Sequence, residues 1–191
     1  FALVLAAAMG LALAACSGQD TDDAADGDTA EDNGGDNNSA DTTGDEETPS
    51  EVTVTSLNGS GTEIQLTLPY DAQRIAILDM ASLDILDALG LGDRVVGTAG
   101  TSLEYLQEYI TDDIPNLGTI KEADLEAVMA CEPDVIFIGG RLSGSYDALS
   151  EIAPVVYLAT DTELGVVGSV RKNATTIASL FGMESKVEQL M

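Results

Sequence analysis

Hydrophobic and polar residues alternate at the start of the folded part of this chain. Within residues 52–69 the alternating apolar residues are Val52 and Val54 in one stretch and Ile64, Leu66 and Leu68 in another, and Asn58-Gly59 lies between the two stretches. Side chains of a strand point to opposite faces in turn, so this alternation is typical of a half-buried strand. Two such stretches around an Asn-Gly pair predict a β-hairpin.

After the hairpin, continuous apolar runs alternate with segments of helical period. The apolar runs predict strands at residues 74–78, 94–99, 134–140 and 155–159. The segments of helical period predict helices at residues 80–90, 121–130, 145–153 and 164–182. Strands that are apolar on both faces and alternate with helices are typical of a parallel sheet. We therefore expect an α/β lobe over residues 52–183, a parallel sheet flanked by helices and preceded by a β-hairpin.

The segment 121–130 has a helical pattern of apolar residues. Helical spacing groups Leu125, Val128 and Met129 together, so we expect them to share a packed face. Cys131 follows this segment, and we expect a small buried residue at the end of the helix rather than a reactive thiol.

The carboxyl ends of the predicted strands indicate where a ligand would bind. In open α/β sheets, ligands bind outside this edge. The ends in this chain are Asp79–Met80, Thr98–Gly100, Gly139–Arg141 and Thr160–Asp161.

The chain opens with an apolar segment, 1–15, that ends in Leu13-Ala14-Ala15-Cys16. A membrane-spanning helix needs about 20 apolar residues, and this segment is shorter. Small residues before a cysteine, followed by an abrupt rise in polarity, favour a cleaved signal peptide over a buried helix with an incidental cysteine. This motif resembles a bacterial lipobox, which implies lipidation of Cys16. No Met and no basic segment precede Phe1, so we expect the sequence to begin within the signal peptide.

Acidic residues dominate the composition, and many of them lie directly after Cys16. The chain has 34 acidic and 7 basic residues and a formal net charge of −27. Residues 16–51 contain no Lys, Arg, aromatic or large aliphatic residue, which predicts a disordered acidic tether. No basic patch is present anywhere, which argues against nucleic acid as a partner.

The residue types restrict the possible chemistry further. The chain has no histidine, which excludes Ser-His-Asp and Cys-His arrangements and the imidazole ligands common in metal sites. The stretch "GGRLSG" (139–144) lacks the spacing of a phosphate-binding loop. Arg141 directly follows a buried strand and two glycines, and a guanidinium there suits an anionic ligand. The alternative is an arginine paired with a nearby carboxylate.

Three stretches together resemble a known family. They read "RIAILDMASLDILDALGLGDRVVGTAGTSLEYLQEY", "NLGTIKEADLEAVMACEPDVIFIGGR" and "YDALSEIAPVVYLATDT". They are similar to the N-terminal lobe of ferric-siderophore substrate-binding lipoproteins of ABC importers, of the group that binds catecholates such as petrobactin. The resemblance runs from about residue 62 to residue 191. It implies two α/β lobes joined by a long helix, of which residues 184–191 would be the start, with the second lobe missing.

The same resemblance implies roles for individual residues. The arginine that follows the two glycines maps to Arg141 and would face the anionic ferric complex. Asp147 and Glu151 would contact arginines of the ABC permease. Lys121 is either a residue at the rim of the cleft or a plain surface lysine. No catalytic residue, metal ligand or cofactor is expected, and the ligand would be an iron(III)–siderophore complex.

The function implied is that of an extracytoplasmic receptor, held at the cell membrane by the lipid on Cys16. It would bind a ferric siderophore and deliver it to the ABC permease. The alternatives are haem or a corrinoid on the same scaffold, or a surface-anchored domain outside transport, such as an enzyme or an adhesion module.

Overall fold

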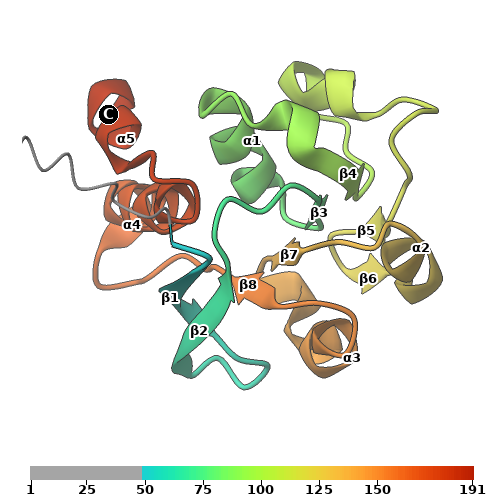
Figure 1. Cartoon of the computed structure of the whole chain (residues 1–191), viewed down its shortest axis with the longest axis horizontal. Coiled ribbons are helices and arrows are strands. Elements are labelled where there is room, and N and C mark those ends of the chain that lie inside the picture. Colours follow the sequence, from blue (N-terminus) through green and yellow to red (C-terminus); the bar gives the residue numbers. More distant parts are fainter. Residues whose placement is uncertain (1–48) are drawn as a thin grey trace, which may run out of the picture. The chain divides into compact units, whose positions relative to one another are not determined.

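The structure is a computed structural model that describes residues 49–191 (Figure 1). The predicted signal peptide, the lipidation site Cys16 and most of the predicted tether lie outside the described residues. No helix within residues 49–191 is both long enough and apolar enough to cross a bilayer.

The predicted β-hairpin is confirmed. Strands β1 (Glu51–Leu57) and β2 (Glu63–Pro69) pair antiparallel, with Val54 opposite Leu66. The connection is a five-residue loop, 58–62, and not a two-residue turn. The side chain of Asn58 organises this loop, because its Oδ1 accepts hydrogen bonds from the backbone N–H groups of Ser60 and Thr62.

The predicted parallel sheet is also confirmed, and it has four strands in the order β4-β3-β7-β8. Their bounds are β3 (Ile75–Ile77), β4 (Val95–Thr98), β7 (Val135–Ile138) and β8 (Val155–Tyr157). The two central strands, β3 and β7, are buried at every position, which is why their sequences are apolar without alternation.

The helices connect and cover these strands. They are α1 (Met80–Ala88), α2 (Leu125–Ala130), α3 (Tyr146–Ser150), α4 (Gly165–Ser179) and α5 (Glu184–Leu190). Short 3-10 helices occupy Gly92–Arg94, Glu104–Tyr109 and Gly140–Ser145. A small two-stranded sheet, β5 (Gly118–Thr119) and β6 (Glu122–Ala123), precedes α2.

The prediction for residues 121–130 is wrong in two respects. The helix begins only at Leu125, because the Asp124 side chain accepts a hydrogen bond from the N–H of Ala127 and so caps the helix there. Only Val128 is buried, whereas Leu125 is 38% and Met129 61% exposed. A helix of less than two turns has too little surface against the sheet to bury all three side chains.

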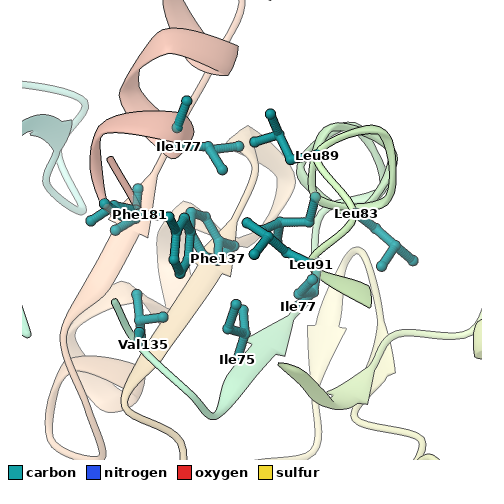
Figure 2. Close-up of a cluster of buried hydrophobic side chains, with 14 of the residues drawn as sticks. Ile75, Ile77, Leu83, Leu89, Leu91, Val135, Phe137, Ile177 and Phe181 are labelled. Carbon is teal, nitrogen blue, oxygen red and sulfur yellow. The ribbon is translucent and has the colours of Figure 1, made fainter. Parts of the chain in front are cut away.

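Two hydrophobic clusters hold the lobe together, one on each face of the sheet. Helices α1, α4 and α5 cover one face, and α2 and α3 cover the other (Figure 1). Phe137 of β7 lies in the middle of the first cluster, among Leu91, Ile177 and Phe181 (Figure 2). Its neighbours Ile136 and Ile138 point to the second cluster, because adjacent strand residues face opposite sides.

The hairpin protects the open edge of the sheet at β8. The Oγ of Ser56 accepts a hydrogen bond of 2.9 Å from the backbone N–H of Tyr157. Ser56 is 2% exposed, so its hydroxyl replaces the backbone partner that a further strand would supply. The hairpin therefore belongs to the folded lobe and is packed against β8 and α4.

Cys131 is buried at the C-terminal end of α2, as the sequence predicted. Its thiol donates a hydrogen bond of 3.2 Å to the carbonyl oxygen of Val96. Burial raises the pKa of this thiol, and the nearby Arg74 only partly opposes that effect.

Candidate functional site

The carboxyl ends of three neighbouring strands line one depression, which we call the edge depression. Its volume is about 450 Å³, and it is lined by Leu78–Ala81, Gly139–Arg141, Leu158–Thr160, Ile120 and Asn173. Strands β3, β7 and β8 are adjacent in the sheet, so their ends converge at this place. This is the edge at which α/β sheets bind ligands.

The fourth strand end does not join this depression. Thr98 and Gly100, at the end of β4, are bonded to the chain that follows: their N–H groups donate to the carbonyl oxygens of Pro115 and Gly118. They line a separate depression beside Tyr109. Three of the four strand ends named from the sequence therefore line the edge depression, and the chain after β8 contributes Thr160 but not Asp161 to it.

Arg141 lies at the rim of the edge depression, in the second position of the 3-10 helix Gly140–Ser145. Its side chain is exposed. No carboxylate of residues 49–191 lies within 4.0 Å of its guanidinium, so the described residues do not supply the ion pair considered as an alternative. An exposed guanidinium without such a partner keeps its donors available for an external anion.

Two residues before Arg141, Gly139 lies in close contact with Asp79. The Oδ2 atom of Asp79 accepts hydrogen bonds of 2.9 Å from the backbone N–H and the hydroxyl of Ser82, which caps α1. A Cβ atom at position 139 would lie 2.5 Å from Oδ1 of Asp79, closer than atoms pack. Any side chain at position 139 would therefore displace the Asp79 carboxylate, and sequence reasoning did not identify this role of Asp79.

Most of the basic side chains form hydrogen bonds or ion pairs within the lobe. Arg94 pairs with Asp71, and Lys172 pairs with Glu63 at 2.9 Å. Arg74 donates to the backbone carbonyls after α2, and Lys186 donates to the carbonyl oxygen of Leu89 after α1. Within residues 49–191 this leaves three basic side chains without a hydrogen bond or ion pair: Lys121, Arg141 and Arg171.

Lys121 lies near the edge depression but does not line it. It is exposed in the turn between β5 and β6, next to Ile120, which does line the depression. Strand β6 packs against the 3-10 helix that holds Arg141. Lys121 and Arg141 therefore belong to adjoining segments.

Asp147 and Glu151, expected to contact a permease, lie apart from the edge depression. Asp147 is in α3, Glu151 follows its last residue, and both side chains are exposed. No hydrogen bond or ion pair joins either side chain to another described residue. Both carboxylates are thus accessible from solvent.

A metal site is not formed by the described residues. No group of three or more His, Cys, Asp or Glu side chains within residues 49–191 is placed to hold a metal ion. The edge depression instead combines the guanidinium of Arg141, two successive glycines and the Asp79 carboxylate, which caps α1. This arrangement can recognise and hold a ligand through charge and backbone contacts.

A parallel sheet covered by helices on both faces, with a depression at its carboxyl edge, defines the class as an α/β lobe. Comparison with known sequences specifies the family: the profile of the periplasmic binding protein family matches residues 75–191. The chain therefore belongs to this family, and the described residues form an N-terminal lobe of its fold.

Individual relatives are siderophore-binding proteins. The petrobactin-binding protein YclQ of Bacillus subtilis is 37% identical over 133 residues, which are 69% of this chain and 40% of that protein. Its crystal structure superposes with a TM-score of 0.65 over 72% of this chain and 48% of that chain, at 34% identity.

Two proteins from Vibrio species that are similar to this chain are also siderophore-binding proteins. The ferric-anguibactin-binding protein FatB of Vibrio anguillarum is 32% identical over 51% of this chain and 30% of its own length. The catecholate-siderophore-binding protein VctP of Vibrio cholerae has a TM-score of 0.64 and 31% identity, over 72% of this chain and 48% of its own. The chain thus spans less than half the length of each of these proteins.

Proposed function

We propose that this chain is part of an extracytoplasmic receptor that binds a ferric siderophore and delivers it to an ABC importer. The observation that carries the proposal is the exposed guanidinium of Arg141 at the edge depression, without a carboxylate partner among the described residues. A ferric catecholate complex is an anion rich in oxygen acceptors, which is the chemistry that a guanidinium recognises.

The net charge of the chain makes the local cation important. An anionic ligand is repelled by an acidic surface, so positive charge has to be concentrated where the ligand binds. Of the 7 basic residues, Arg141 lines the depression and Lys121 lies in the adjoining turn. The names of the relatives support the same ligand class, since YclQ, FatB and VctP are siderophore-binding proteins.

Three further assignments complete the proposal. The receptor acts by binding alone, with no catalytic residue and no resident cofactor. A lipid on Cys16 holds it at the outer face of the cell membrane, and residues 16–51 act as the tether. Asp147 and Glu151 contact the permease, for which their exposure on the same short helical segment is suitable.

Titration of the full-length protein with a ferric catecholate chelate tests the ligand assignment. We expect Arg141→Ala to weaken binding about 10-fold to 150-fold, the equivalent of about 1.5–3 kcal/mol for a hydrogen bond to a charged group. Arg171→Ala is the matched control, because Arg171 is also an exposed arginine without a described partner but does not line the depression. Unchanged affinity in Arg141→Ala, or an equal loss in Arg171→Ala, would contradict the assignment.

The permease assignment has a different readout. We expect Asp147→Lys/Glu151→Lys to bind the ferric chelate normally but to reduce iron uptake in cells that depend on this receptor. The charge reversal would place like charges opposite each other at the contact. Normal uptake by the variant would refute the role of these two residues.

A further inference from the structure

Tyr157, the last residue of β8, is a buried tyrosine whose hydroxyl has no hydrogen-bond partner among residues 49–191. The residue as a whole is only 7% exposed. The hydroxyl of a buried tyrosine usually has a hydrogen-bond partner. A buried polar group without one requires an explanation, and a binding role is one such explanation.

The hydroxyl of Tyr157 is nevertheless open to solvent. Within residues 49–191, every side-chain oxygen or nitrogen atom that is sealed from solvent has a hydrogen-bond partner. Since the Tyr157 hydroxyl has no such partner, it is not sealed. The small exposed part of this residue therefore includes its polar end.

The hydroxyl lies beside Gly140, which lines the edge depression and directly precedes Arg141. Apart from the chain neighbours of Gly140, the nearest atom to a Cβ at position 140 would be the hydroxyl oxygen of Tyr157, at 3.4 Å. Gly140 does not have a positive φ, so its backbone conformation does not require glycine. The missing side chain instead leaves space next to the hydroxyl.

The position of Tyr157 is fixed by contacts with three parts of the lobe. Its backbone pairs with Ile138 of β7, and its N–H group donates a hydrogen bond of 2.9 Å to Oγ of Ser56. Its side chain belongs to the hydrophobic cluster on the face that α2 and α3 cover. A donor that is already held in place loses little conformational entropy when a ligand binds.

From this geometry we infer that Tyr157 is a further ligand-binding residue, whose hydroxyl donates a hydrogen bond to an oxygen atom of the ligand beside Gly140. Arg141 supplies charge-assisted hydrogen bonds, and Tyr157 supplies a neutral donor of fixed direction. This inference rests on the proposed function. It adds the requirement that the bound ferric chelate presents an oxygen acceptor at Gly140.

Calorimetric titration of the full-length protein with a ferric catecholate chelate tests the inference. Tyr157→Phe removes the hydroxyl and keeps the ring, and we expect it to weaken binding about 10-fold. The free energy of unfolding in urea should stay unchanged, because the hydroxyl has no partner among the described residues. Tyr70→Phe is the matched control: the Tyr70 hydroxyl also lies beside a glycine, Gly182, but Tyr70 does not line the edge depression. Tyr70→Phe should therefore bind the chelate normally.

Gly140→Ala tests the same contact from its other side. The new Cβ atom would lie in van der Waals contact with the hydroxyl, in the space where a ligand oxygen has to approach to about 2.5–3.0 Å. We expect Gly140→Ala to fold normally and to weaken binding about as much as Tyr157→Phe. The two substitutions together should weaken it little further, because both remove one hydrogen bond.

The outcomes separate this inference from the proposed function. Unchanged affinity in Tyr157→Phe overturns the role of Tyr157 and leaves the siderophore receptor intact. Weaker binding together with a lower free energy of unfolding overturns it as well, since the hydroxyl would then stabilise the fold. If Tyr157→Phe did not fold, normal affinity in Gly140→Ala would refute the contact. Failure of the unsubstituted protein to bind the chelate would refute the proposed function, and this inference with it.

Discussion

The contact between Gly139 and Asp79 predicts that Gly139→Ala destabilises the protein when Asp79 is present and stabilises it when Asp79 is replaced by alanine. A Cβ atom at position 139 would lie 2.5 Å from Oδ1 and 3.1 Å from Cγ of Asp79, and every other neighbour lies at least 3.6 Å away. Gly139→Ala therefore forces only the Asp79 side chain to move. That side chain is held by two hydrogen bonds from Ser82, so moving it breaks the cap of α1.

The magnitude follows from two terms. Loss of an N-cap costs about 0.5–2 kcal/mol, and typically about 1 kcal/mol. The backbone of Gly139, at φ −107° and ψ 177°, is open to alanine, so the less flexible unfolded chain offsets about 0.4–1 kcal/mol. We expect Gly139→Ala to destabilise the protein by up to about 1.5 kcal/mol. In an Asp79→Ala background no cap remains to be broken, and the same substitution should stabilise by about 0.4–1 kcal/mol.

Urea unfolding followed by circular dichroism measures all four proteins of this cycle. Asp79→Ala alone should lower the free energy of unfolding by about 1 kcal/mol through the lost cap. The coupling between the two substitutions should then equal the cap term, about 0.5–2 kcal/mol. An equal effect of Gly139→Ala in both backgrounds would show that the clash with Asp79 does not disfavour a side chain at position 139.

Two further predictions concern the core and the buried thiol. Phe137→Ala should lower the free energy of unfolding by about 3–5 kcal/mol because Phe137 is fully buried, whereas Met129→Ala should change it by less than about 0.5 kcal/mol. Equal losses in urea unfolding would contradict the burial of the two positions. The raised pKa of Cys131 should make its thiol react more slowly with a disulfide reagent in the native protein than in urea. Since the folded state then holds this proton more tightly than the unfolded one, stability should fall as the pH rises past the ordinary thiol value of 9.0, and Cys131→Ala should weaken that fall. A native thiol that reacts as fast as the unfolded one would refute this prediction.

The sequence predicted the elements of this fold well where the signal was local. The alternation over 52–69 predicted β1 and β2, and the apolar run 134–140 predicted β7, because periodicity depends only on neighbours along the chain. The family could also be predicted from the sequence, because long stretches such as 132–141 resemble sequences of the family and follow one another in the same order. The burial of Leu125 and Met129 was predicted wrongly, since spacing shows which residues share a face but not how much of the face is covered.

For the candidate site, sequence alone determined which residues end the strands, and only the tertiary structure decided which of them meet. Arg141 could be singled out because two glycines and a buried strand precede it. The exclusion of the β4 end, the contact of Gly139 with Asp79 and the pairing of Lys172 with Glu63, 109 positions apart, depend on strand order and on side-chain packing. The sequence pattern records the environment of each residue along its own element, whereas the site is formed by residues that only the packing of distant elements brings together.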